Sequence, residues 1–174
     1  KLKAKSYDLF VVAAYGKIIP KSMLKIPKFG TLNVHPSLLP RWRGPSPIQS
    51  VILAGDKETG VSIMLVDEYM DHGAVLTQRV IEVGDKKMPY LRLHDQLARL
   101  GADLLIQTIP QWIHGAITPT PQDDARAIYS KILKREDGRI DWNRSAEEIE
   151  RMVRGLNPWP SAWTLWPSPE KIYR

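Results

Sequence analysis

The sequence contains no cysteine, and this absence excludes several classes of protein. A disulfide framework, a cysteine-ligated zinc site and a thiol nucleophile all require that residue. Long apolar runs are also missing, because none approaches the roughly 20 residues that a membrane-spanning helix needs. We therefore expect no membrane span, no signal peptide and a reducing, cytosolic location.

Acidic residues are scarce in the first 50 positions, which contain seven lysines and two arginines but a single acidic residue, Asp8. This segment carries a charge of +8, whereas the whole chain carries +6, so the remaining residues sum to −2. A basic segment suggests an anionic partner such as a nucleic acid. The helical spacing of Lys17, Lys21 and Lys25 favours a simpler interpretation, which is a solvated face.

Apolar residues make up 43% of the 174 positions, enough to build a core. Short apolar runs alternate with amphipathic segments, and the run at residues 9–14 is typical of a strand buried on both faces. The pattern predicts strands at 9–14, 31–35, 61–66 and 75–83, and helices at 47–55 and 93–112. Strands that alternate with helices predict an α/β fold whose sheet is at least partly parallel.

The composition changes after Gly115, which makes the proline- and aspartate-containing segment 118–124 the best candidate for a boundary. We expect this connector to be exposed and extended, and to be cut by a protease before the helix at 93–112. Ser145 and Glu148 form a capping box at the start of a short helix over 145–156. The predicted division is a first domain at 1–117, a linker at 118–160 and the start of another module at 161–174.

Asn33 and His35 are the first candidates for chemistry. Side chains two positions apart on a strand share a face, and Pro36 ends the strand directly after His35. Ligands bind at the carboxyl ends of strands in parallel α/β sheets. There, an amide can donate to a developing oxyanion while an imidazole handles a proton. A structural histidine remains the alternative.

Asp71 lies in a polar turn, 67–73, that directly follows the strand 61–66 and therefore also lies at the carboxyl end of a strand. We expect it beside His35, where a carboxylate can orient an imidazole or accept its proton. An acidic turn that binds its own backbone is the alternative. A metal site formed by His35, Asp71 and His72 has no supporting ligand spacing, and His94 and His114 are expected to be structural.

The loop from Ser37 to Gly44 contains two prolines and two arginines. Such a loop can shape a rigid pocket and present cations to carboxylates or phosphates, although an ordinary strand-to-helix connection is the alternative.

These motifs together resemble the formyltransferases that use 10-formyltetrahydrofolate. The resemblance rests on the pattern Asn33-x-His35-Pro-Ser-Leu-Leu-Pro, then Arg43-Gly44, then Asp71-x-Gly73. The segments RIDW at 139–142 and NPWP at 157–160 are similar to the branch of the family that formylates methionyl-tRNA. The resemblance implies a Rossmann-like fold with flanking helices and, after the linker, a β-barrel similar to an OB fold.

The resemblance also implies roles for individual residues. Asn33 is expected to stabilise the oxyanion, His35 to handle the proton and Asp71 to be its carboxylate partner. The segment lining the folate site is expected at Ser37, Leu38, Leu39 and Pro40. The implied reaction transfers the formyl group of 10-formyltetrahydrofolate to the α-amine of methionyl initiator tRNA, without a metal, in a bacterial cytoplasm or an organellar matrix.

Two rival functions stay open. One rival is an enzyme of the same family that formylates a sugar nucleotide or a purine ribotide with the same side chains. The other is a non-catalytic RNA-binding or scaffold fragment, which the basic first segment would also fit. The chain is similar to only part of the family pattern, without its opening strands and its terminal barrel. We therefore expect the isolated chain to self-associate through the strand at 9–14, or to be marginally stable.

Overall fold

The computed structural model describes residues 6–83, 88–165 and 172–173. Four strands form one sheet in the order β1 (Phe10–Val12), β2 (Thr31–His35), β3 (Glu58–Leu65) and β4 (Val75–Glu82). β1 and β2 are parallel, whereas β3 is antiparallel to both β2 and β4. The sheet is thus partly parallel, as the alternating pattern predicts.

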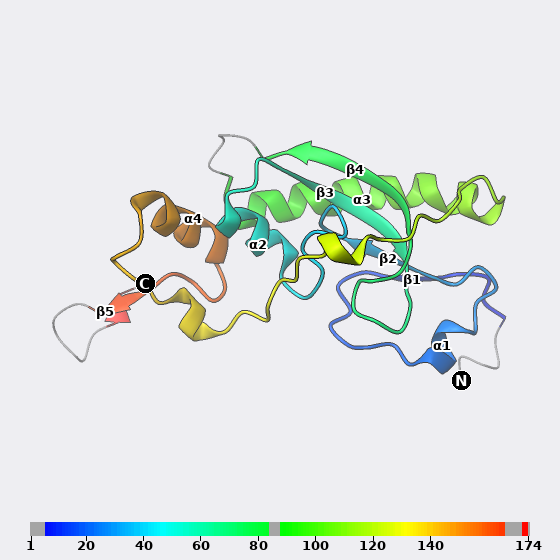
Figure 1. The fold of residues 1–174 in the computed structure, drawn as a ribbon, viewed down its shortest axis with the longest axis horizontal. Coiled ribbons are helices and arrows are strands. Elements are labelled where there is room, and N and C mark those ends of the chain that lie inside the picture. Colours follow the sequence, from blue (N-terminus) through cyan, green and yellow to red (C-terminus); the bar gives the residue numbers. More distant parts are fainter. Residues whose placement is uncertain (1–5, 84–87, 166–171, 174) are drawn as a thin grey trace.

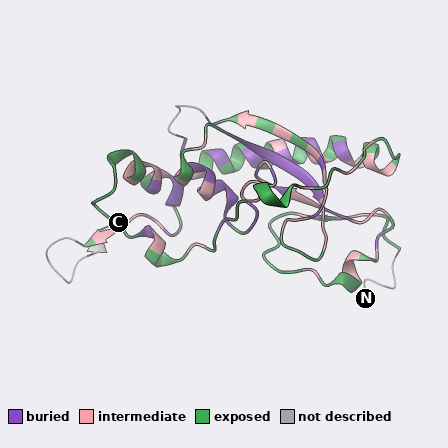
Figure 2. Cartoon of the chain, in the orientation of Figure 1, coloured by how far each residue is buried: buried purple, intermediate pink, exposed green. Residues whose placement is uncertain are grey.

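Two helices of the sheet-containing part follow the sequence pattern closely. α2 (Pro47–Ala54) ends at Gly55, whose φ of +73° is the left-handed cap that glycine favours. α3 (Tyr90–Ile113) packs against the sheet through residues spaced three or four apart, and it lies along β3 and β4 in Figure 1. These buried positions are Leu93, Leu97, Gly101, Leu104 and Thr108. Figure 2 shows the buried residues gathered on β3 and on one side of α3.

The core lies between α2, α3 and the sheet, and it includes Leu32, Val61, Ile63 and Leu97. Gly101 permits the close approach of α3 to the sheet, since a Cβ there would lie 2.7 Å from a methyl carbon of Val34. Val34 therefore faces α3. Because side chains alternate along β2, Asn33 and His35 project from its other face.

β1 is shorter and more exposed than the apolar run at 9–14 predicts. It covers only Phe10–Val12, and the side chain of Val11 is 46% exposed. The expectation of a strand buried on both faces is wrong, because β1 is the edge strand of the described sheet and pairs only with β2. All three lysines of the expected solvated face are exposed, but α1 (Lys21–Leu24) includes only Lys21, so the helical spacing is not the reason for their exposure.

The connector after α3, which from here on means residues 118–130, is mostly exposed, as expected of 118–124, but it is attached to the sheet rather than free. Thr120 pairs with Val75 at the start of β4, and Tyr129 pairs with Arg43. Short 3-10 turns follow at Asp124–Arg126 and Arg135–Gly138. The expected early cleavage of this connector by a protease stays a prediction.

α4 (Ala146–Leu156) begins with the predicted capping box, in which Ser145 and Glu148 exchange hydrogen bonds. Its buried side chains, Met152 and Leu156, belong to a helix that packs against α2, and the two helices lie together in Figure 1. β5 (Thr164–Leu165) and β6 (Ile172–Tyr173) form a separate two-stranded sheet. Within the described ranges, no helix combines the length and the apolar character needed to cross a membrane.

Candidate active site

β2 delivers Asn33 and His35 to the same side of the sheet. Asn33 is half-buried, and the imidazole of His35 is only 4% exposed. Both line one large cavity, and the strand ends at His35 as the following proline predicts. The local pattern of the sequence therefore fixes the relative placement of these two side chains.

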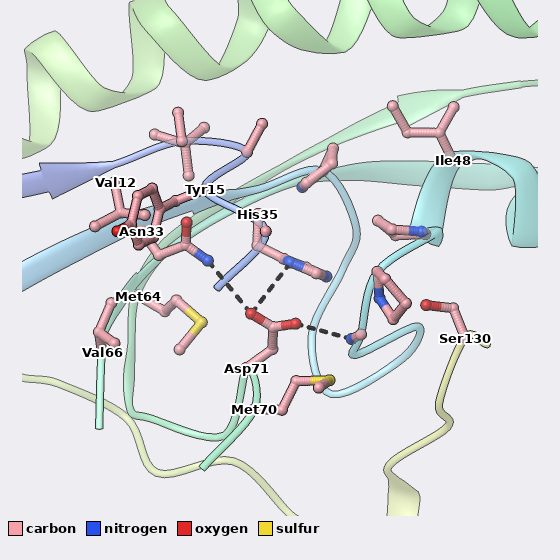
Figure 3. Close-up of a pocket in the computed structure, with 18 of the residues that line it drawn as sticks. Val12, Tyr15, Asn33, His35, Ile48, Met64, Val66, Met70, Asp71 and Ser130 are labelled. Atoms are coloured by element: carbon pink, nitrogen blue, oxygen red, sulfur yellow. Dashed lines mark hydrogen bonds and ion pairs between the residues drawn. The ribbon is translucent and has the colours of Figure 1, made fainter. Parts of the chain in front are cut away.

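Asp71 reaches both of them from the turn that follows β3. Its Oδ1 accepts a hydrogen bond from Nδ2 of Asn33 at 3.3 Å and lies 3.6 Å from Nδ1 of His35. Its Oδ2 accepts a hydrogen bond from the backbone N–H of Gly44 at 2.8 Å. Figure 3 shows the carboxylate beside Asn33 and His35. The structure thus brings Asn33, His35 and Asp71 together.

The route by which Asp71 arrives differs from the expected one. β3 is antiparallel to β2, so its carboxyl end at Leu65 pairs with Leu32 near the start of β2. The turn then doubles back over the sheet, and Gly73 permits this because a Cβ there would lie 1.9 Å from the carbonyl oxygen of Leu65. The idea that Asp71 meets His35 because both follow carboxyl ends at one sheet edge is therefore wrong.

The ring of His35 has a defined tautomer. Its Nε2 lies 2.9 Å from the carbonyl oxygen of Trp42, and a carbonyl only accepts hydrogen bonds, so Nε2 carries a proton. Burial lowers the pKa of His35, while the carboxylate of Asp71 and the bond to Trp42 oppose that effect. The neutral ring therefore has its free lone pair on Nδ1, the atom that faces Asp71.

The cavity has a volume of about 950 Å³, which is in the range of small-molecule sites. Apolar residues of β1 and of the following loop form one wall, and α3 contributes another. Tyr15, Ile18, Tyr69 and Met70 line it and are largely exposed. His94 also lines the cavity and is exposed, and its expected structural role stays a prediction.

The segment Ser37–Leu38–Leu39–Pro40 lies beside the cavity and does not line it. The carbonyl of Ser37 accepts a hydrogen bond from the hydroxyl of Ser62 at 2.6 Å, and Leu39 is bound to Ser62 and Gln78. Leu38 packs over Gly60. These contacts attach the segment to β3 and β4, and its predicted contact with folate stays a prediction.

Both arginines of the following loop are paired inside the protein. Arg41 makes two hydrogen bonds to the carboxylate of Asp56, at 2.8 and 2.7 Å. The guanidinium of Arg43 is 1% exposed and binds Asp124, Tyr129 and Gln122. These two guanidinium groups therefore stabilise the loop. The cations that the loop is expected to present bind side chains of the protein itself.

His72 does not approach His35. Its Nδ1 lies 2.6 Å from Asp67, whose carboxylate raises the pKa of the imidazole, and its Nε2 lies 3.4 Å from Asp124. Across residues 6–83 and 88–165, no group of three or more histidine, aspartate or glutamate side chains is arranged to hold a metal ion.

Sequence reasoning assigned no supporting role to the residues that bind Asp71 and the loop at Arg43. Gly44 provides the N–H that binds Asp71, and Gln122 donates to the carbonyls of Asp71 and Gly73. Ser130 binds both the carbonyl of Arg43 and the N–H of Ser46. Gln122 and Ser130 come from the connector, which no local pattern links to the turn at 67–73.

Comparison with known families decides the classification of this arrangement. The family described as formyl transferase matches residues 1–109, more than half of the chain. The chain belongs to the formyl transferase family. A second family, the formyl transferase C-terminal domain, matches residues 132–174. The division predicted at residues 117 and 160 stays a prediction.

Curated members of the formyl transferase family are similar over most of the chain. The methionyl-tRNA formyltransferase of Chloroflexus aurantiacus is 50% identical over 165 residues, which are 95% of this chain and 53% of that protein. Those of Roseiflexus sp. and Enterococcus faecalis are 50% and 46% identical, over 95% and 91% of the chain. The chain spans about half the length of these relatives.

Solved structures support the fold. A sugar N-formyltransferase from a Shewanella species matches 97% of this chain and 68% of its own, with a TM-score of 0.80 and 22% identity. HypX from Aquifex aeolicus, in complex with tetrahydrofolic acid, matches 90% of this chain and 27% of its own, with a TM-score of 0.78 and 21% identity. The Rossmann-like formyltransferase fold is thereby confirmed.

Proposed function

We propose that the protein carrying this chain transfers the formyl group of 10-formyltetrahydrofolate to the α-amine of methionyl initiator tRNA. The observation that carries this proposal is the identity of about half the residues, over 95% of the chain, to curated methionyl-tRNA formyltransferases. The contact between Asn33, His35 and Asp71 supplies the chemical groups that the reaction needs. A bacterial cytoplasm or an organellar matrix is the location we assign to it.

The reaction begins with attack of the neutral amine on the formyl carbon. Amines of this type have a pKa of about 7.7, so a large fraction is neutral at physiological pH. The new C–N bond converts the formyl oxygen to an oxyanion. Asn33 donates one N–H of its amide to Asp71 and retains a second for this oxyanion.

The attacking nitrogen becomes positively charged and must lose a proton. His35 accepts that proton at Nδ1, because Nε2 is already protonated and bound to the carbonyl of Trp42. The carboxylate of Asp71, with its Oδ1 3.6 Å away, stabilises the imidazolium that forms. The bond between the formyl carbon and N10 of the folate then breaks, and N10 takes the proton from His35.

The cavity beside these groups offers space for the formyl donor. Its volume of about 950 Å³ and its apolar walls suit an aromatic ligand. Ser37, Leu38, Leu39 and Pro40 remain the proposed folate segment. Their attachment to β3 and β4 holds Pro36, which does line the cavity, at a fixed position.

The test is a comparison of acceptors in the full-length protein. Labelled 10-formyltetrahydrofolate is incubated with charged initiator tRNA or with an amino-sugar nucleotide, and the label on each acceptor is measured. We expect rapid transfer to the tRNA and none to the sugar nucleotide. Transfer to the sugar nucleotide alone would replace the proposed substrate, and binding of tRNA without transfer to either acceptor would leave a non-catalytic RNA-binding protein.

A further inference from the structure

Gln122, in the connector after α3, holds the backbone of the turn that carries Asp71. Its Nε2 donates to the carbonyl oxygen of Asp71 at 2.9 Å and to that of Gly73 at 2.8 Å. Its Oε1 accepts a hydrogen bond from Nε of Arg43 at 2.9 Å. Both N–H groups of the amide and its oxygen are thus occupied, which fixes the orientation of this side chain.

Arg43 connects Gln122 to the loop whose backbone binds His35 and Asp71. Its guanidinium is almost completely buried and also binds Asp124 at 2.8 Å and the hydroxyl of Tyr129 at 3.1 Å. The backbone of Arg43 pairs with the connector on both sides, through Ile128 and Ser130. The connector therefore binds both the loop at Arg43 and the turn at Asp71.

Arg43 lies between the two residues whose backbone groups bind His35 and Asp71. The preceding residue, Trp42, provides the carbonyl that binds Nε2 of His35, and the following residue, Gly44, provides the N–H that binds Asp71. Gln122 and Arg43 thus join the partners of the imidazole and of the carboxylate into one hydrogen-bonded unit.

Asp71 needs such support because of its own backbone. Its φ of +49° lies in the left-handed region, which a residue with a Cβ seldom adopts unless neighbouring contacts hold it. Gln122 donates one hydrogen bond to the carbonyl of this strained residue and the other to the carbonyl of Gly73, two positions later.

We propose that Gln122, supported by Arg43, is a positioning residue that holds the Asp71 carboxylate against Nδ1 of His35. This inference rests on the proposed function for its kinetic consequence. Gln122 touches neither the cavity nor the reacting atoms. It acts through Asp71, and its removal should change turnover and the titration of His35 more than it changes binding of the formyl donor.

Two substitutions separate the contacts of Gln122. Gln122→Glu keeps an acceptor for Arg43 but removes both N–H donors and places an oxygen against two carbonyls. Gln122→Leu removes every polar contact. The matched control is Gln107→Leu on α3, an exposed glutamine whose side-chain oxygen accepts a hydrogen bond from Arg79 and whose backbone carbonyl accepts one from Gln111.

The measurements are kcat and KM for formyl transfer in the full-length protein, and an NMR titration of the His35 imidazole. A displaced carboxylate should lower kcat by about 10- to 100-fold with KM for the donor nearly unchanged. It should also lower the pKa of His35, because the negative charge that favours the protonated ring is further away. Gln107→Leu should match the wild type in both measurements.

Wild-type kcat and wild-type titration of His35 in Gln122→Glu would overturn the positioning role. If Gln122→Leu does not fold, Gln122→Glu decides alone, since its bond to Arg43 is retained. If the wild-type protein transfers no formyl group, the proposed function fails. The titration of His35 in the variants then still decides whether Gln122 positions Asp71.

Discussion

Replacement of Gly44 by alanine would disturb the loop that binds Asp71, and the structure gives the size of the effect. An alanine Cβ at this position would lie 2.8 Å from the carbonyl oxygen of Ser130 and 3.0 Å from its hydroxyl. The φ of Gly44 is +102°, a conformation that costs a residue with a Cβ about 1–3 kcal/mol. Moving Ser130 would weaken its bonds to Arg43 and Ser46, each contributing about 1 kcal/mol. We expect Gly44→Ala to lower the free energy of unfolding by about 2–5 kcal/mol.

Gly115→Ala is the matched control for this substitution. Gly115 also has a positive φ, +71°, but its added Cβ would have no atom within 4 Å. Only the conformational cost of about 1–2 kcal/mol should appear there. Urea denaturation of both variants gives the two free energies, and the formylation assay gives turnover, which should fall only in Gly44→Ala. Equal destabilisation of the two variants, with full turnover in both, would refute the reasoning.

Four further predictions concern the site and its support. Asn33→Ala should lower turnover by about 10²–10³-fold while the formyl donor still binds, and near-normal turnover would remove Asn33 from the mechanism. Asp71→Asn should lower the pKa of His35 further, which an NMR titration would reveal. In the wild type, the neutral form of this buried histidine should contribute stability at pH above ~6.5. That stability should be lost as the pH falls, because the unfolded chain binds the proton at a higher pH than the folded chain does. Leu156→Ala should destabilise the protein by about 2–4 kcal/mol, whereas Val153→Ala on the exposed side of α4 should cost less than about 1 kcal/mol in the same denaturation experiment. The isolated chain should associate through the edge of β1 in sedimentation experiments or be only marginally stable in urea denaturation, and a stable monomer would contradict this.

The sequence predicts those parts of the fold that depend on neighbouring residues. The spacing of Leu93, Leu97 and Leu104 predicts α3 because one face of a helix repeats every three or four positions. The alternation along β2 places Asn33 and His35 on one face in the same way. The capping box at Ser145 is likewise a local signal, and it is confirmed.

The sequence does not predict features that depend on strand direction or on distant contacts. The apolar pattern of β3 does not indicate whether it runs parallel or antiparallel to β2. The path by which Asp71 reaches His35 therefore cannot be predicted from the sequence. The edge position of β1 also depends on its neighbours rather than on its own residues. Gln122 lies 51 positions from Asp71, and no periodicity links the two.

The protonation of His35 tests the central claim about the site most directly. Nitrogen-15 NMR of selectively labelled histidine in the full-length protein distinguishes the two ring nitrogens at neutral pH. The hydrogen bond to the carbonyl of Trp42 and the burial of the ring predict a protonated Nε2 and an unprotonated Nδ1. That state leaves Nδ1 able to accept the proton of the attacking amine. A neutral ring protonated at Nδ1 instead would contradict the account, because no acceptor would then face Asp71 and the reacting amine.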